Sequence, residues 1–228
     1  MRAAFDELAA LGAAFGQGAV QLTPGNHPTP GFQRHVAGAA AASRSRTRTH
    51  HGFDFEARKR EVWSSDGRCL VDADSVHPPT SDSAAARAVE ARGGVGAWLE
   101  THAFGAHPLL ETMYPGYLLG TGDELEDAMR LGAPLAVDVS HVFIQLCAGA
   151  MKETTWQRLA AYEHVREVHV SANAGTHDSH APLTPDSFGL GWARERLRAG
   201  VPTVLECYVH RLSPPERAGQ MELLLGGT

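Results

Sequence analysis

The sequence predicts an α/β fold, specifically a short TIM-type (β/α) barrel that occupies residues 1–228 as one domain. Short apolar runs recur about every thirty residues along the chain. Helix-like stretches separate these runs, and that alternation is typical of a parallel sheet. Metal-ligand side chains stand where most of the runs end, which is the position that faces the rim of a barrel.

The predicted strands are the apolar runs, and turn-forming residues bound several of them. They span residues 19–23, 46–50, 71–77, 108–112, 135–139, 165–170 and 201–207. Pro24-Gly25 ends the first strand, and Pro78-Pro79 follows the third, so the chain leaves the sheet at both places. A Rossmann fold would need a glycine-rich phosphate turn after its first strand. This chain has none there, which favours the barrel.

The predicted helices follow amphipathic spacing and capping signals. They span residues 3–15, 81–91, a segment opening at Thr121, 154–162, 189–198 and a closing segment from Pro215. The spacing of Thr121 and Glu124 fits a capping box. The stretch before residue 46 is predicted as a loop with a weak helix. A helix stands where a barrel normally begins with a strand, so either the first strand is missing, a neighbouring segment closes the barrel, or the true start lies upstream.

The composition is that of an ordinary globular protein. A net charge of −6 argues against a general nucleic-acid binder, so a small-molecule substrate or a short peptide is the expected partner. No apolar stretch approaches the ~20 residues that span a bilayer. The N-terminus lacks the layout of a secretory signal, which predicts a cytoplasmic location without membrane contact. Cys69, Cys147 and Cys207 show no CxxC spacing and are expected to be buried thiols.

Nine residues with metal-binding side chains share the same phase in the predicted repeat. They are His50, His77, Glu111, Asp138, His141, His169, Asp178, His180 and Glu206. One histidine after a strand is weak evidence, but nine metal-binding side chains at matching positions of the repeat predict a metal site. The set exceeds the needs of one tetrahedral cation, so two or three divalent ions are expected. Histidine with carboxylate suits zinc, iron or manganese.

Some of these residues also admit a purely structural interpretation. Asp138 could cap a following helix while His141 packs beneath a loop. Spacing cannot choose between His50 and His51 as the ligand. His177 stands beside the ligand motif but has no clear role.

The two glutamates at the ends of apolar runs have a structural alternative as well. A buried carboxylate is costly unless it is paired or bound to a metal. Glu111 and Glu206 could therefore pair with arginines such as Arg194 or Arg211. If they do not, they are the candidate catalytic acid and base.

From about residue 19 to 209, the chain resembles the xylose isomerase-like TIM-barrel superfamily, which includes sugar isomerases, epimerases and the endonuclease IV group. The order of the nine ligands is similar to the trinuclear zinc set of the endonuclease IV group. That resemblance prefers His50 over His51, because His50-His-Gly-Phe parallels the group's His-Ala-Pro-Tyr. The sugar epimerases share only a subset, usually around one metal, with two glutamates moving protons. The shared subset is Glu111, Asp138, His169 and Glu206.

A partial resemblance extends to the multinuclear iron-dependent oxidases that modify peptide cysteines. Val-Asp-Val-Ser-His-Val-Phe and Asp-Ser-His-Ala-Pro-Leu are similar to signatures of that family. The family tends to carry asparagine where this chain has His141. Gln21 also replaces a glutamate often found in the second strand of the superfamily, and the basic DNA-gripping loops of the endonucleases are not evident.

The leading expectation is metal-assisted hydrolysis of a phosphoester in a small or nucleotide-sized substrate. One alternative is a sugar or sugar-phosphate isomerase or epimerase that uses Glu111 and Glu206 as its acid and base. A second is an iron-dependent oxidase acting on a peptide or small molecule. A metal-dependent binding or scaffold protein is the remaining class. The sequence leaves the oligomeric state open.

Overall fold

The computed structural model describes residues 2–16, 18–24, 30–43, 46–56, 60–101 and 108–226. In these ranges the chain forms a mixed α/β fold whose strands pair in parallel. The strands are β1 (Ala19–Leu22), β2 (Arg46–Thr49), β3 (Ser75–Val76), β4 (Leu109–Glu111), β5 (Leu135–Asp138), β6 (Val165–Val170) and β7 (Thr203–Leu205). Each predicted run therefore contains a strand, although most strands are shorter than their runs.

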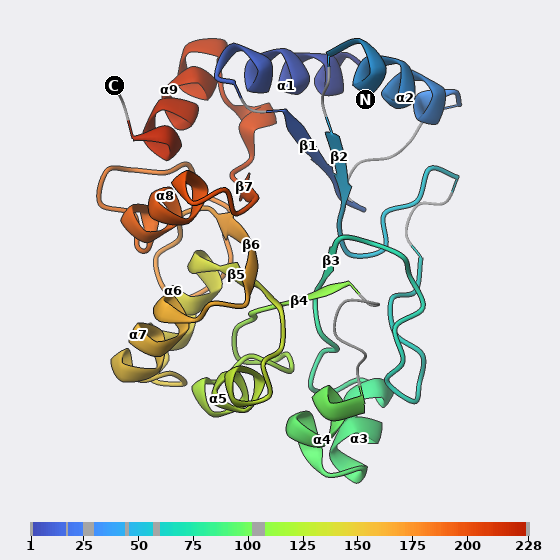
Figure 1. Cartoon of the computed structure of the whole chain (residues 1–228), viewed down its shortest axis with the longest axis vertical. Coiled ribbons are helices and arrows are strands. Elements are labelled where there is room, and N and C mark those ends of the chain that lie inside the picture. The colour runs from blue at the N-terminus through green and yellow to red at the C-terminus, as the bar shows by residue number, and fades with distance from the viewer. Residues whose placement is uncertain are drawn as a thin grey trace.

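The strands form one curled sheet and a smaller pair beside it (Figure 1). Strands β3 to β7 lie in chain order in a five-stranded sheet, and β1 pairs with β2. His50, directly after β2, makes a parallel bridge to Ser75 of β3. The His51 amide also donates to the Ser75 carbonyl at 3.0 Å. The β1–β2 pair thus extends the curved sheet beyond β3, and the architecture is that of a partial α/β barrel.

Helices lie around the outside of the curled strands (Figure 1). They are α1 (Arg2–Ala14), α2 (Phe32–Ser43), α3 (Ala84–Ala91), α4 (Gly94–Thr101), α5 (Gly122–Arg130), α6 (Val139–Cys147), α7 (Glu153–Ala161), α8 (Leu190–Arg198) and α9 (Pro214–Leu225), with a 3-10 turn at Val209–Arg211. The capping box of Thr121 and Glu124 at the start of α5 is confirmed. Helix α6 corrects the predicted strand end, because Val139 is already helical.

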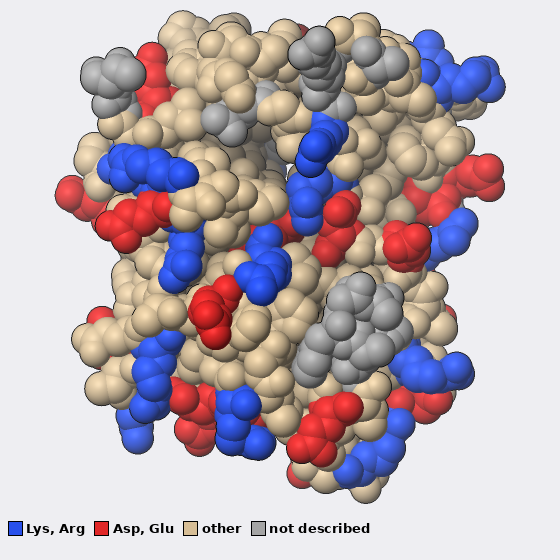
Figure 2. All heavy atoms as spheres, in the orientation of Figure 1, with Lys and Arg blue, Asp and Glu red and all other residues tan. Residues whose placement is uncertain are grey.

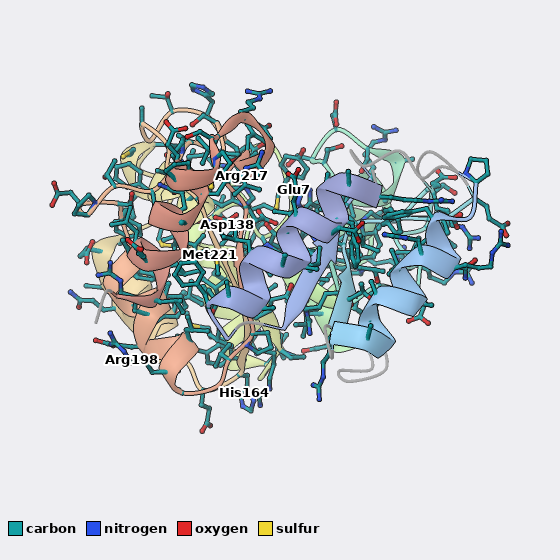
Figure 3. The ribbon with its side chains drawn as sticks, turned by 90° about the horizontal axis from the view of Figure 1, so that it is seen from above. Glu7, Asp138, His164, Arg198, Arg217 and Met221 are labelled. Carbon is teal, nitrogen blue, oxygen red and sulfur yellow. The ribbon has the colours of Figure 1, made fainter. Side chains whose placement is uncertain are left out.

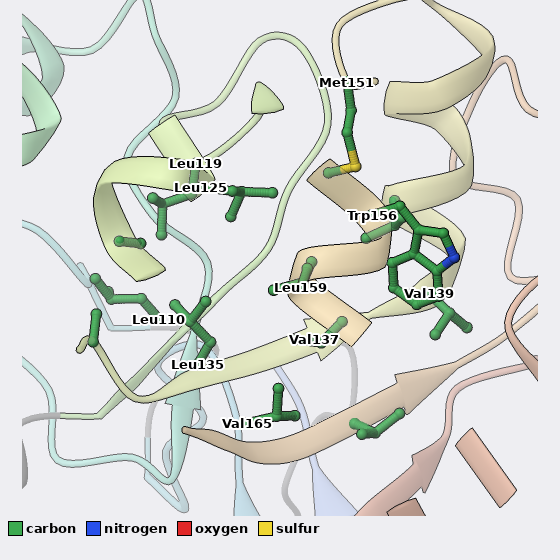
Figure 4. Packing of buried hydrophobic residues seen from close by; sticks show 14 of the residues in the cluster. Leu110, Leu119, Leu125, Leu135, Val137, Val139, Met151, Trp156, Leu159 and Val165 are labelled. Atoms are coloured by element: carbon green, nitrogen blue, oxygen red, sulfur yellow. The ribbon is translucent and has the colours of Figure 1, made fainter. Parts of the chain in front are cut away.

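Strands β5 and β6 have an apolar core on their outer face, against the helices, and polar side chains on the inner, concave face of the sheet. Leu135 and Val137 of β5 belong to the main hydrophobic cluster, together with Leu125 of α5 and Leu159 of α7 (Figure 4). Side chains alternate along a strand, so the other face of β5 carries Asp138 inward. The apolar residues that hold the helices therefore leave the inner face of the sheet free for polar side chains.

The first and last helices meet on the outside of the fold. Arg217 of α9 forms an ion pair with Glu7 of α1 at 2.6 Å, and the two helices lie near each other when seen from above (Figure 3). On the face drawn in Figure 2, basic and acidic side chains are interspersed. Among the helices of the described ranges, none is both long and apolar enough to cross a membrane.

Candidate metal centre

The nine predicted ligands form one connected cluster at the carboxyl ends of the strands. Six of them stand at, next to or just after the carboxyl ends of the successive strands β2 to β7: His50, His77, Glu111, Asp138, His169 and Glu206. His141 lies in the first turn of α6, and Asp178 and His180 lie in the loop after β6. Ring nitrogens and carboxylate oxygens at 4.0 Å or less link every member to another member.

Glu111 stands at the centre of this cluster and is fully buried. Its Oε2 lies 3.6 Å from Nε2 of His50, 3.5 Å from Nε2 of His77 and 3.2 Å from Nδ1 of His169. Its Oε1 lies 3.3 Å from Nδ1 of His141. One carboxylate therefore faces four imidazoles that come from different segments of the chain.

Two groups of side chains have the geometry to hold a metal ion. One consists of His50, His77 and Glu111, and the other of Glu111, Asp138, His169 and Glu206. Within each group, the ligand atoms lie within 4.8 Å of one another. Glu111 belongs to both groups, so ions bound in both would be neighbours.

Unpaired polar atoms support this assignment. Both oxygens of Glu111, Oδ2 of Asp138, Nε2 of His141 and Nδ1 of His169 are buried and form no hydrogen bond. A buried polar atom without a partner costs about 1–3 kcal/mol. Cations would satisfy these lone pairs together, so the donor set fits metal ions.

Asp178 and His180 line the cluster from the loop after β6. Oδ2 of Asp178 lies 3.3 Å from Nε2 of His141 and 3.0 Å from Nε2 of His180. His180 has a positive φ of 44°, which is unusual for a residue other than glycine. Nearby His177 is exposed, and its Nδ1 lies 3.1 Å from Oγ1 of Thr176. The structure thus brings His180 to the cluster and leaves His177 outside it.

The histidines fall into two electrostatic classes. Burial lowers the pKa of His50 to about 4 and lowers the pKa of His77 well below its usual value. For His141, burial is outweighed by Asp138 and Asp178, which raise its pKa. His50 and His77 are accordingly neutral at pH 7, with a lone pair available for a metal.

His169, His180 and the acids complete this pattern. Glu206 and Glu111 raise the pKa of His169 against the effect of burial, and a hydrogen bond with Asp178 raises that of His180. Burial, together with the charges of Glu111 and Asp138, raises the pKa of Glu206 to about 8. The metal-free site therefore holds protons where cations would otherwise balance its carboxylates.

Three polar residues beneath the cluster were not predicted from the sequence. Arg48, Ser75 and Glu167 each precede a predicted ligand by two residues. Because side chains alternate along a strand, that spacing could have placed all three on the inner face of the sheet. Glu167 and Ser75 are fully buried.

The structural alternatives can now be compared with the contacts. Arg194 donates to the carbonyl of Leu223, and the guanidinium of Arg211 lies 4.3 Å from the centre of the Tyr208 ring. Glu111 and Glu206 face histidines instead. The arginine pairing considered for these two glutamates is therefore not what the structure contains.

The choice between the adjacent histidines is clear in the geometry. His50 is buried and points into the cluster, whereas the ring of His51 stacks on His77 with 4.3 Å between centroids. The expectation for the cysteines is wrong in one case, because Cys147 is exposed while Cys207 is buried. Sγ of Cys207 lies 3.8 Å from Oε1 of Gln220 on α9.

Comparison with known proteins assigns this fold and site to no family. No family model matches the chain, and no curated protein is significantly similar to it in sequence. The resemblance to xylose isomerase-like barrels therefore remains a prediction, resting on the order of the ligands in the sequence.

Proposed function

We propose that this chain is a multinuclear metal-dependent enzyme that hydrolyses a phosphoester in a small or nucleotide-sized substrate. The observation that supports this most strongly is the position of Glu111, which is common to both groups of potential ligands. A shared carboxylate is suited to holding two cations side by side. Paired divalent cations supply Lewis acidity to both the attacking and the leaving oxygen of a phosphoryl group.

The charges around the site support two divalent cations. The carboxylates of Glu111, Asp138, Glu167, Asp178 and Glu206 are buried or nearly buried, and the arginine that contacts them is the half-buried Arg48, which pairs with Glu167. Once metal binding has displaced the protons from Glu206 and the histidines, the five carboxylates and the guanidinium of Arg48, which also contacts the more exposed Asp74, leave four negative charges that two divalent cations would balance. Buried charge without such compensation is strongly unfavourable.

Aromatic rings beside the cluster support a substrate larger than a simple ion. The Tyr114 ring lies 4.9 Å from the ring of His141, and the Tyr208 ring lies 5.2 Å from that of His180. Tyr208 is 37 % exposed. A base or sugar ring could pack against the exposed part of this surface, where the guanidinium of Arg211 also lies 4.3 Å from the centre of the Tyr208 ring, while its phosphate reaches the metal ligands.

An iron-dependent oxidase is the second candidate, because of one specific feature. His50, His77 and Glu111 form a set of two histidines and one carboxylate. That combination is typical of non-haem iron(II) oxygenases. The same site geometry is thus compatible with redox chemistry if iron is the resident metal.

The isomerase alternative uses fewer of these residues. Its proton carriers would be Glu111 and Glu206, whose pKa values are displaced in opposite directions. A single cation beside them would leave no role for His50 and His77, which lie in the other group. For this reason we place it third.

The decisive experiment is elemental analysis of protein purified both aerobically and anaerobically, followed by activity assays. We expect two or three zinc or manganese ions per chain, and hydrolysis of bis(p-nitrophenyl) phosphate that is lost with a chelator and restored by the same metal. Iron with oxygen consumption would instead support the oxidase. A single ion would move the assignment to the isomerase, and a protein that binds no metal would refute the proposal.

A further inference from the structure

Arg48, Ser75 and Glu167 form a hydrogen-bonded layer beneath the two candidate metal groups, here called the supporting layer. Glu167 has one oxygen, Oε2, in an ion pair with Nη2 of Arg48. Its other oxygen, Oε1, accepts from Oγ of Ser75 at 2.6 Å and lies 2.7 Å from Nε2 of His169. Oγ of Ser75 in turn lies 3.1 Å from Nδ1 of His50. A single carboxylate oxygen therefore connects to one histidine of each group.

The hydrogen bonds fix which nitrogen of His50 carries the proton. Glu167 is paired with Arg48, so it is an ionised carboxylate and can only accept. Ser75 has one hydroxyl hydrogen, which it gives to Glu167. Its oxygen must then accept from Nδ1–H of His50, which leaves Nε2 of His50 bare. That Nε2 is the atom that lies 3.0 Å from Nε2 of His77.

For His169 the same carboxylate oxygen selects the opposite nitrogen. Oε1 of Glu167 accepts from Nε2–H of His169 at 2.7 Å. The remaining nitrogen, Nδ1, lies 3.2 Å from Oε2 of Glu111 and 3.3 Å from Oε1 of Glu206. Nδ1 is buried without a hydrogen bond, and it is the ring nitrogen that would bind a metal ion once its proton has been displaced.

We infer that Glu167 is the positioning residue for both candidate metal groups, orienting His169 directly and His50 through Ser75 so that opposite ring nitrogens face the ions. This inference rests on the metal binding proposed above. Carboxylates that hold a ligating histidine from behind fix its tautomer and ring orientation. Loss of such a partner typically weakens metal affinity by 10- to 100-fold.

The first test measures the histidine tautomers directly. Metal-free protein labelled with ¹⁵N-histidine is loaded with Zn²⁺ alone, and the ring nitrogens are observed by long-range ¹H–¹⁵N NMR. We expect zinc on Nδ1 of His169 with Nε2 protonated, and zinc on Nε2 of His50 with Nδ1 protonated. Coordination of both histidines through the same nitrogen would overturn the inference.

The second test uses Glu167→Gln and Ser75→Ala. Arg48, Ser75 and His169 all donate to Glu167. The side-chain amide introduced by Glu167→Gln would have only one accepting oxygen, so its NH₂ group would face either Arg48 or the Ser75 and His169 donors and could not accept from them. Glu167→Gln should therefore weaken Zn²⁺ binding in both groups by about 10- to 100-fold. Ser75→Ala should weaken only the group that contains His50.

Glu124→Gln serves as the matched control, because this carboxylate is partly buried in a capping box on α5, away from the cluster. Its zinc affinity should equal that of the wild type. Should Glu167→Gln fail to fold by circular dichroism, the wild-type tautomers and Ser75→Ala still decide the question. Wild-type protein without zinc affinity would refute the proposed function. Zinc binding that both supporting-layer variants leave unchanged would refute this inference alone.

Discussion

The two carboxylate oxygens of Asp138 contact the same residue, His141, in different ways. Oδ1 accepts from the backbone amide of His141 at 3.1 Å and from that of Ser140 at 2.6 Å, so it caps α6. Oδ2 lies 3.8 Å from Nε2 of the His141 ring and forms no hydrogen bond. Helix capping and participation in the cluster are therefore compatible, and one carboxylate performs both.

Substitutions at Asp138 should separate these two contributions. Asparagine caps helices about as well as aspartate, so Asp138→Asn should unfold at nearly the wild-type temperature in the metal-free state but bind metal much more weakly. Asp138→Ala should lose both the helix cap and the metal-binding oxygen, and the missing cap should lower the free energy of unfolding by about 1 kcal/mol. Thermal denaturation of metal-free protein and metal titration measure the two effects. Wild-type metal affinity in Asp138→Asn would contradict the assignment of Oδ2.

Replacement of His180 should distinguish a multinuclear site from a single-metal one. We expect His180→Ala to lose phosphoesterase activity and part of its bound metal, because His180 contacts Asp178 and Glu206 inside the cluster. His177→Ala is the matched control in the same loop, since its side chain is exposed and outside the cluster. An isomerase would keep most of its metal without His180. Full metal content and phosphoesterase activity in His180→Ala would be incompatible with our proposal.

Metal binding should release protons at pH 7. The pKa values of His141 and His169 are raised well above their usual value, and that of Glu206 is about 8, so these groups hold protons at pH 7 in the metal-free protein. The pKa of His180 is shifted in the same direction. A cation displaces those protons, and therefore lower pH should weaken binding and higher pH should strengthen it. Isothermal titration calorimetry in buffers of different ionisation enthalpy measures the number released, expected to be several. A binding enthalpy independent of buffer would contradict this.

The Tyr208 ring should contribute to substrate binding without holding metal. Tyr208→Ala should raise KM for a nucleotide-sized substrate by about 5- to 150-fold, since stacking on one aromatic ring contributes about 1–3 kcal/mol. Metal content should not change, because the contact of Tyr208 with the cluster is a ring contact to His180. Tyr208→Phe keeps the ring and should bind like the wild type. Equal KM values for all three proteins would exclude a stacking role.

Much of the fold was accessible from sequence because local patterns set local structure. The apolar runs predicted where strands form, and the Thr121–Glu124 spacing predicted how α5 begins, because both depend on nearby residues. The end of β5 was misplaced by one residue, since Val139 fits either a strand or a helix. Capping by Asp138 resolves that ambiguity in favour of α6.

The clustering of the candidate ligands was also accessible from sequence, because parallel strands bring their carboxyl ends to one rim whatever their separation along the chain. That rule placed Glu111 and His169 together, although it could not tell His50 from His51. The choice depends on the turn after β2, where His50 is buried in the cluster and His51 stacks on His77.

Only the tertiary structure decided how the ligands are held. Glu167 and Ser75 are separated by 92 residues, yet one hydrogen bond between them links histidines of both candidate metal groups. From the sequence, strand alternation predicts only that the side chains of Glu167 and Ser75 face the inside of the sheet. It does not predict which residues they contact. The sequence by itself determined where the strands and most of the helices form, and which candidate ligands gather at one end of the sheet. The partners of those ligands, and the nitrogens they expose, follow from contacts that exist only when the sheet has curled.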